Sequence, residues 1–208
     1  MEITIIGTGN MARGIGTRAV AGGHDVTLLG TEQAHAEELA AELDGSSVKA
    51  GTVGDPIAGN VVVLAVWYPV SREVVERYGD QLDGKVVVDI TNPIDVDAFE
   101  PLDLDAGSAA QEIAGQAPGA KVVKAFNTTF AGTLGEGEVA GQELDVLIAS
   151  DDEEAKRTVS RIVSDAGLRP IDAGALKRAR ELEALGYLHM TLQQGLGTNF
   201  GSTVKVLS

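Results

Sequence analysis

The residues of this sequence best suited to chemistry form a glycine-rich segment near its beginning. Gly7, Gly9 and Ala12 are spaced as G-x-G-x-x-A, and they directly follow the apolar run 3–6. A glycine at the first position adopts backbone angles that a side chain would forbid, and a glycine at the second lets a ligand approach the main chain. The amides at the N-terminus of the helix that follows bind phosphate groups. The spacing therefore predicts a site for the diphosphate of a dinucleotide.

The elements that must position this segment are visible as apolar runs separated by stretches of helical periodicity. Near-continuous runs of valine and isoleucine are typical of strands that helices cover on both faces. We expect strands at 2–6, 25–29, 61–66, 86–90, 121–125, 145–149 and 168–172. We expect helices from 10 to about 20 and at 33–43, 71–78, 108–117, 152–166 and 176–196. The alternation predicts an α/β fold of the Rossmann type, with a doubly wound, mostly parallel sheet.

The chain is expected to form one compact unit with two portions. Residues 1–125 form the dinucleotide-binding Rossmann portion, and residues 126–208 form a small α/β extension packed on it. The glycine-rich segment 130–142 lacks periodicity, so we expect a loop there that borders a ligand. The last helix has an apolar stripe, whereas its first turns are charged and include Glu183. We expect the stripe to pack on the sheet, with a contact in a homodimer as the alternative.

Composition excludes several classes of function. The chain of 208 residues has no cysteine and three scattered histidines, which argues against a disulfide, a thiolate nucleophile and a structural metal. Its formal charge of −15 argues against a nucleic-acid partner, because phosphates require a basic face. No apolar stretch approaches the roughly 18 residues that span a bilayer, and no leader precedes the first strand. We therefore expect a cytoplasmic protein without a membrane partner.

The end of the second expected strand bears on the choice of nucleotide. Enzymes that use NAD commonly place an acid there to bind the ribose hydroxyls, whereas this chain has Gly30. Thr31 and the following helix N-terminus offer a hydroxyl and amides to the 2′-phosphate of NADP. Glu32 either faces solvent or accepts a hydrogen bond from the ribose of NAD. We expect NADP, with NAD as the alternative.

Polar and aromatic residues follow three further strands, at the edge where ligands of open α/β sheets bind. Asn127 directly follows an apolar strand, where an amide has little reason to serve packing. Trp67 and Tyr68 either wall the cleft or cap the core beside Pro69. The expected cofactor-binding residues are Gly7, Thr8, Gly9, Asn10, Met11, Gly30, Thr31, Glu32, Val66, Trp67, Tyr68, Asn92, Pro93 and Asn127.

Four short motifs together resemble one known family. They are TGNM at 8–11, TNP at 91–93, KAFNTT at 124–129 and LRPIDAG at 168–174. Over nearly its whole length the chain resembles the NADP oxidoreductases of the coenzyme F420-dependent type. The resemblance implies direct hydride transfer between NADP(H) and a deazaflavin, a flavin or another small acceptor. Such chemistry needs orientation of two rings rather than a proton-transferring triad, so no catalytic side chain is assigned.

One departure from the family and two alternative functions stand beside this resemblance. The family commonly has a hydroxyl residue followed by arginine after the second strand, where this chain has Thr31 and Glu32. The departure bears on the choice between NADP and NAD and leaves the diphosphate site unchanged. The segment 7–12 also resembles the opening of pyrroline-5-carboxylate reductases, which have a longer helical dimerisation region. A redox sensor that binds NADP(H) without turnover would keep the same glycine turn.

Overall fold

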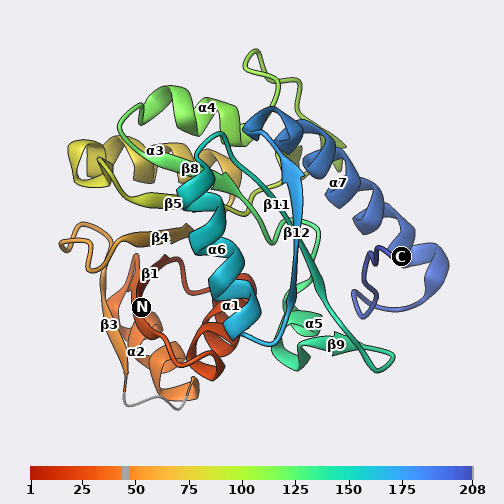
Figure 1. The fold of residues 1–208 in the computed structure, drawn as a ribbon, viewed down its shortest axis with the longest axis horizontal. Helices are drawn as coiled ribbons and strands as arrows, with labels where there is room; N and C mark the ends of the chain where they lie inside the picture. Colours follow the sequence, from red (N-terminus) through yellow and green to blue (C-terminus); the bar gives the residue numbers. More distant parts are fainter. Residues whose placement is uncertain (44–46, 208) are drawn as a thin grey trace.

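The computed structural model describes residues 1–43 and 47–207. Across this part of the chain, the central sheet has eight strands in the order β12-β11-β8-β5-β4-β1-β2-β3 (Figure 1). These strands are β1 (Glu2–Ile6), β2 (Asp25–Gly30), β3 (Val48–Thr52), β4 (Val61–Leu64), β5 (Val86–Asp89), β8 (Lys121–Lys124), β11 (Asp145–Ala149) and β12 (Arg169–Gly174). The run from β8 to β3 is parallel throughout, whereas β11 meets β8 in the antiparallel sense. The predicted Rossmann-type fold with a mostly parallel sheet is confirmed.

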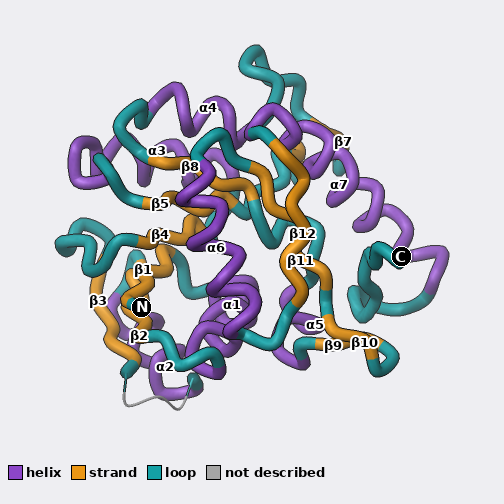
Figure 2. Tube along the Cα trace, in the orientation of Figure 1, coloured by secondary structure: helices purple, strands orange, loops and turns teal. Residues whose placement is uncertain are grey.

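Helices cover both faces of the sheet, as Figures 1 and 2 show. They are α1 (Asn10–Ala21), α2 (Gln33–Glu42), α3 (Tyr68–Tyr78), α4 (Ala109–Gln116), α5 (Ala131–Glu136), α6 (Glu153–Asp165) and α7 (Ala179–Leu196), with the 3-10 turns η1 (Gly79–Leu82) and η2 (Leu176–Arg178). Because side chains alternate along a strand, Ile5 belongs to the apolar cluster that includes residues of α1, α2 and α6. Ile6 belongs to the cluster on the other face, which includes residues of α3 and α4. Within the described residues, no helix is both long and apolar enough to span a bilayer.

Two expectations about secondary structure were wrong. The segment 130–142 is not a loop: it contains α5, then β9 (Glu138–Val139), which pairs with β10 (Gln142–Glu143). The six residues of α5 have a weak helical pattern, but Leu134 is fully buried against α1, so tertiary packing stabilises the helix. Strand β3 was not predicted, because its residues VKAGT are only partly buried at the sheet edge.

The start of α3 also differs from the expectation. The helix begins at Tyr68, three residues before the predicted Ser71, and Pro69 lies in its first turn. Proline suits this position because the first amides of a helix have no partner within the helix. The remaining two small strands, β6 (Ile94–Asp95) and β7 (Glu100–Pro101), form a hairpin beyond the end of β5.

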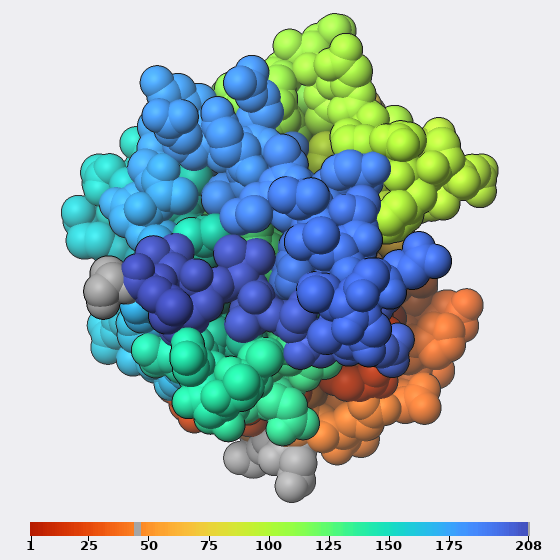
Figure 3. All heavy atoms as spheres, turned by 90° about the vertical axis from the view of Figure 1, so that its right-hand side faces the viewer, coloured from red at the N-terminus to blue at the C-terminus, as the bar shows by residue number. Residues whose placement is uncertain are grey.

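The chain after α7 folds back over the molecule and is fixed by a buried carboxylate. In Figure 3 this dark-blue end of the chain lies beside α7 and above the green segment that contains α5. Asp145 accepts hydrogen bonds from the Lys205 ammonium at 2.7 Å, the Val206 amide at 2.8 Å and the Arg169 guanidinium at 2.7 Å. Burial alone would raise the pKa of Asp145, but these donors outweigh burial and lower it to about 2. The carboxylate therefore ties the last residues to β11.

This anchor predicts a specific acid sensitivity. An aspartate with a folded-state pKa of about 2 and an unfolded-state pKa of about 4 stabilises the fold above pH ~4, by about 2–3 kcal/mol, and loses that contribution towards pH ~2. We expect Asp145→Asn to lower the free energy of unfolding at pH 7, and the deficit to shrink as the pH falls through this window. Urea unfolding at several pH values checks this. In the control Asp103→Asn, at an exposed loop residue, the difference in free energy of unfolding from wild type should not change with pH. A difference for Asp145→Asn that stays constant with pH would contradict the lowered pKa of Asp145.

Candidate functional site

The turn between β1 and α1 requires glycine at its first position. Gly7 has a φ of +123°, and a Cβ atom on it would lie 2.3 Å from the carbonyl oxygen of Ala65. Its amide donates to the carbonyl of Leu29 on β2 at 2.9 Å, which fixes the turn between β1 and its neighbours. The expected reason for this glycine is therefore confirmed in the backbone itself.

The second glycine of the turn leaves open space above the start of α1. A Cβ atom on Gly9 would meet nothing within 4 Å, and Gly9 caps the helix without a side-chain hydrogen bond. Ala12 is fully buried, so the first turn of the helix packs closely on the sheet. The first amides of this helix of 12 residues therefore face a space that an anion can enter.

A cavity of about 960 Å³ lies over this turn and along the carboxyl ends of the parallel strands. Such a crevice is where open α/β sheets bind their ligands. It is lined by eleven of the expected site residues, namely Gly7, Thr8, Gly9, Asn10, Met11, Thr31, Val66, Trp67, Tyr68, Asn92 and Asn127. The structure therefore brings together positions that are more than 100 residues apart in the sequence.

Three expected site residues do not line this cavity. Gly30 is buried at the end of β2, and a Cβ atom there would lie 3.0 Å from Cγ2 of Thr8. Glu32 is exposed at the N-terminus of α2, and its side chain makes no capping hydrogen bond. Pro93 is buried and accepts a hydrogen bond from the Leu102 amide at 2.9 Å. Gly30 and Pro93 therefore lie next to the lining residues Thr31 and Asn92 in the chain but do not border the cavity themselves.

The two aromatic residues after β4 have different environments. Trp67 is 64% exposed, whereas Tyr68 is buried. The Tyr68 hydroxyl donates to the carboxylate of Glu112 on α4, and burial together with this bond raises the pKa of Tyr68 to about 12. Tyr68 therefore packs into the fold and Trp67 is free to contact a ligand, although both border the cavity.

Asn92 and Asn127 form a reciprocal pair at the strand ends. The Nδ2 of Asn127 donates to Oδ1 of Asn92 at 2.9 Å and to the Leu182 carbonyl at 2.8 Å. The Nδ2 of Asn92 donates to the main-chain carbonyl of Asn127 at 2.9 Å. Gly186 of α7 lets the helix approach closely, because a Cβ there would lie 2.7 Å from Oδ1 of Asn92. These bonds fix the orientation of the Asn127 side chain.

Two buried polar atoms beside this pair have no hydrogen-bond partner among the described residues. They are Oδ1 of Asn127 and Oγ1 of Thr91, on side chains that are 5% and 4% exposed. Both residues line the cavity. Both atoms are almost fully enclosed, so the accessible parts of Thr91, Asn92 and Asn127 are what offer polar groups to a ligand at this end of the cavity.

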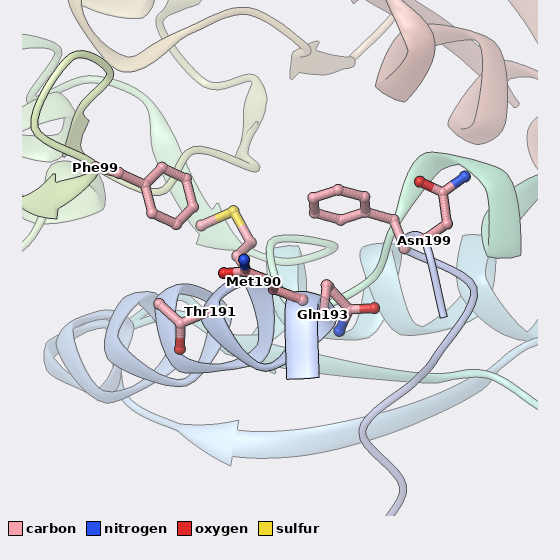
Figure 4. A pocket seen from close by; sticks show the side chains of 7 residues that line it. Phe99, Met190, Thr191, Gln193 and Asn199 are labelled. Carbon is pink, nitrogen blue, oxygen red and sulfur yellow. The ribbon is translucent and has the colours of Figure 1, made fainter. Parts of the chain in front are cut away.

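A smaller pocket of about 400 Å³ adjoins the cavity and shares Met190 and Phe200 with it. Figure 4 shows Phe99 and Met190 pointing toward one another across this pocket. Its lining is apolar or neutral and polar, and consists of Phe99, Met190, Thr191, Gln193, Gln194, Asn199 and Phe200. Phe99 and Phe200 have φ values of 52° and 62°, in the region where non-glycine residues are strained. The pocket suits an uncharged planar group.

His189 of α7 holds the segment that carries Phe200. Its Nδ1–H donates to the Thr128 carbonyl at 3.2 Å, so Nε2 accepts from the Ser202 hydroxyl at 2.8 Å. Phe130 stacks on the imidazole with a centroid distance of 4.2 Å, and Phe200 meets Phe130 edge-on at 5.1 Å. Burial lowers the pKa of His189, which favours this neutral ring. The chain after α7 is thereby part of the cavity wall.

Sequence analysis missed several residues that line the cavity. Thr91, Met190, Phe200 and Arg77 were not expected there. Thr91 was quoted only as part of the TNP motif, although a hydroxyl directly after an apolar strand carries the same signal as Asn127. No pattern in the sequence pointed to the others, because they lie on helix faces or in the last residues, far from the glycine turn.

Comparisons with known proteins agree on one family. The sequence model of the family described as NADP oxidoreductase, coenzyme F420-dependent, matches residues 2–93. The F420-dependent NADP reductase of Methanothermobacter thermautotrophicus is 31% identical over 207 residues, which cover 92% of this chain and 89% of that protein. A crystal structure of a proposed F420-dependent NADP-reductase from Arthrobacter sp. FB24 superimposes with a TM-score of 0.87 at 26% identity, over 99% of both chains.

A further relative is considerably longer than this chain. The metalloreductase STEAP3 of Rattus norvegicus is 33% identical over 190 residues, which cover 88% of this chain but 36% of that protein. This chain therefore corresponds to about a third of that relative.

The fold, the glycine turn and the full-length match to the archaeal reductase agree with one another. The chain therefore belongs to the coenzyme F420-dependent NADP oxidoreductase family and is an NADP-dependent oxidoreductase.

Proposed function

We propose that this chain transfers a hydride between NADP(H) and a deazaflavin of the coenzyme F420 type. The observation that carries the proposal is the cavity that begins over the glycine turn and reaches Asn92 and Asn127 at the ends of the parallel strands. A nicotinamide has a carboxamide, which can exchange hydrogen bonds with side-chain amides at that place. The archaeal relative named an F420-dependent NADP reductase supports the choice of acceptor.

The residues of the cavity fit a dinucleotide in one direction. The diphosphate is assigned to the turn 7–11, where the first amides of α1 face open space. The adenosine ribose is assigned to Thr31 at the end of β2, and the nicotinamide to Thr91, Asn92 and Asn127. Bound NADPH would supply the hydride, and the chain would supply its orientation.

The acceptor is assigned to the side of the cavity that Met190 and Phe200 close. These two residues connect the cavity with the neutral pocket next to Phe99. Apolar side chains there exclude water from the space between two planar rings, which limits loss of the hydride to solvent. The exposed amide of Gln194 in the pocket lining can bond the polar edge of such a ring, whereas the buried amide of Gln193 is bonded to the His189 carbonyl and the Thr198 hydroxyl.

A direct assay tests the acceptor. Purified protein is mixed with NADPH and, in separate reactions, F420, FMN, a ferric chelate and pyrroline-5-carboxylate, while absorbance of the reduced nicotinamide is followed. Consumption of NADPH with F420 at a rate well above the other acceptors is expected. Faster turnover with another acceptor would replace the deazaflavin, and binding of NADPH without consumption in any reaction would favour a sensor.

Replacement of Asn127 by alanine tests its assigned contact with the nicotinamide. In Asn127→Ala the carboxamide of the nicotinamide loses the side-chain amide beside it, so we expect kcat/KM for NADPH to fall roughly 10- to 100-fold. Affinity for 2′,5′-ADP, which has no nicotinamide, should remain within about twofold. The exposed variant Asn60→Ala should change neither quantity. A parallel loss of 2′,5′-ADP affinity would instead indicate a general disturbance of the site, and unchanged kinetics would refute the assignment.

A further inference from the structure

The end of the cavity nearest β2 contains a cation that the proposed function has not used. Arg77 of α3 is the only lysine or arginine among the described residues that line the cavity. Glu73, one turn earlier on the same helix, is the only acidic one. Within residues 1–43 and 47–207, no ion pair joins Arg77 to this or any other carboxylate. An arginine at a cavity wall without an ion pair among the described residues is available to an anion.

Contacts of the main chain place Arg77 at the same end of the cavity as Thr31. A Cβ on Gly54 would lie 3.6 Å from Nε and 3.8 Å from Nη2 of Arg77, so the guanidinium lies against this loop. The neighbouring Val53 donates its amide to the Gly30 carbonyl at 2.8 Å, and Gly30 directly precedes Thr31. Val53, Thr31 and Arg77 all line the cavity. The hydroxyl of Thr31, directly after β2, and the guanidinium of Arg77 on α3 therefore border the same end of the cavity.

The loop that holds this arrangement is itself fixed. The Gly54 amide donates to the Tyr78 hydroxyl at 2.9 Å, which ties the loop after β3 to α3. Asp55 accepts from the Thr52 amide at 2.7 Å, so its carboxylate is occupied within the loop. The position of Arg77 relative to β2 is therefore set by bonds to both sides of the loop.

We propose that Arg77, together with Thr31, binds the 2′-phosphate of NADP(H) and so determines the preference for NADP over NAD. The inference rests on the proposed function, because it assumes that the nucleotide lies along this cavity. A phosphate monoester carries nearly two negative charges, and a guanidinium is the side chain best matched to it. Glu32 occupies the position directly after Thr31, is exposed and does not line the cavity. The cation is therefore supplied by α3 rather than by the loop after β2.

Calorimetry with four ligands tests this assignment. Wild-type protein should bind NADPH and 2′,5′-ADP at least roughly 10-fold more tightly than NADH and 5′-AMP, respectively. In Arg77→Gln the affinities for NADPH and 2′,5′-ADP should fall roughly 10- to 100-fold, while those for NADH and 5′-AMP change less than about twofold. Arg72→Gln is the matched control, because Arg72 lies on the same helix, pairs with Glu112 at 3.7 Å and does not line the cavity. It should leave all four affinities unchanged.

Each outcome separates this inference from the proposed function. Equal loss of NADPH and NADH affinity in Arg77→Gln would mean that Arg77 contacts the adenine, and would overturn the inference. Equal wild-type affinity for NADPH and NADH would overturn it as well. Discrimination of 2′,5′-ADP that depends on Arg77, in a protein that turns over no acceptor, would support the inference while the proposed reaction fails.

Discussion

Replacement of Gly9 by aspartate is expected to weaken NADPH binding at least roughly 100-fold without unfolding the protein. The structure has open space where the new side chain would begin, since a Cβ on Gly9 meets nothing within 4 Å. That space is where the diphosphate is assigned, so the variant places a carboxylate beside two phosphate groups. Calorimetry with NADPH and thermal unfolding of the same samples measure the two halves of this prediction.

Two further variants separate charge from shape and from folding. Gly9→Asn has nearly the shape of Gly9→Asp without its charge, so the difference between them measures the repulsion. Gly7→Ala should instead lower the melting temperature, because its Cβ would overlap the Ala65 carbonyl at 2.3 Å in a backbone with φ of +123°. NADPH affinity unchanged in Gly9→Asp would contradict the assigned position of the diphosphate.

Replacement of Lys124 by methionine is expected to destabilise the fold by about 3–5 kcal/mol. The Lys124 side chain is fully buried, and its ammonium donates to Asp89 at 2.7 Å, to Glu183 at 2.8 Å and to the Thr91 carbonyl. Without the ammonium, two buried carboxylates lose the charge that balances them. Burial already raises the pKa of Glu183, and Lys124 opposes that shift, so the variant should also take up a proton more readily.

Lys121→Met on the same strand is the matched control for Lys124→Met. Lys121 is partly exposed and pairs with Glu154 at 3.0 Å at the surface, so its loss should destabilise the fold far less than the loss of Lys124. Chemical unfolding of both variants at pH 7 measures the difference. Equal free energies of unfolding for the two variants would contradict a stabilising role of the buried cluster of Lys124, Asp89 and Glu183. This cluster lies at the ends of β5 and β8, just before Thr91 and Asn127.

The parts of this protein that the sequence predicted are those that depend on local rules. Gly7 is required by one backbone angle and one close contact, and both arise within the turn that the motif describes. The apolar runs that became β4 and β5 are covered on both faces, so their composition alone marks them as strands. Asn127 was predicted as a site residue because an amide after such a run has little reason to serve packing; in the structure it lines the cavity, and its Nδ2 also donates to the Leu182 carbonyl of α7.

The parts that the sequence did not predict depend on contacts between distant elements. Lys124 meets Asp89 across 35 residues and Glu183 across 59, so no window of sequence contains the ion cluster. Glu183 was expected among the charged residues at the start of the last helix, yet it is 6% exposed and accepts from the Ala109 amide at 3.1 Å. Arg77 is an exposed arginine on a helix, a pattern shared with many residues that only interact with solvent. Its place at the cavity wall depends on the loop after β3, and β3 was not predicted from the sequence.

A crystal structure of the protein with NADP⁺ tests where the dinucleotide binds. We predict density for the diphosphate over the amides at the start of α1, with the nicotinamide carboxamide beside the side chains of Asn92 and Asn127. A nucleotide whose diphosphate lies away from residues 7–11, or whose nicotinamide lies away from the ends of β5 and β8, would contradict it.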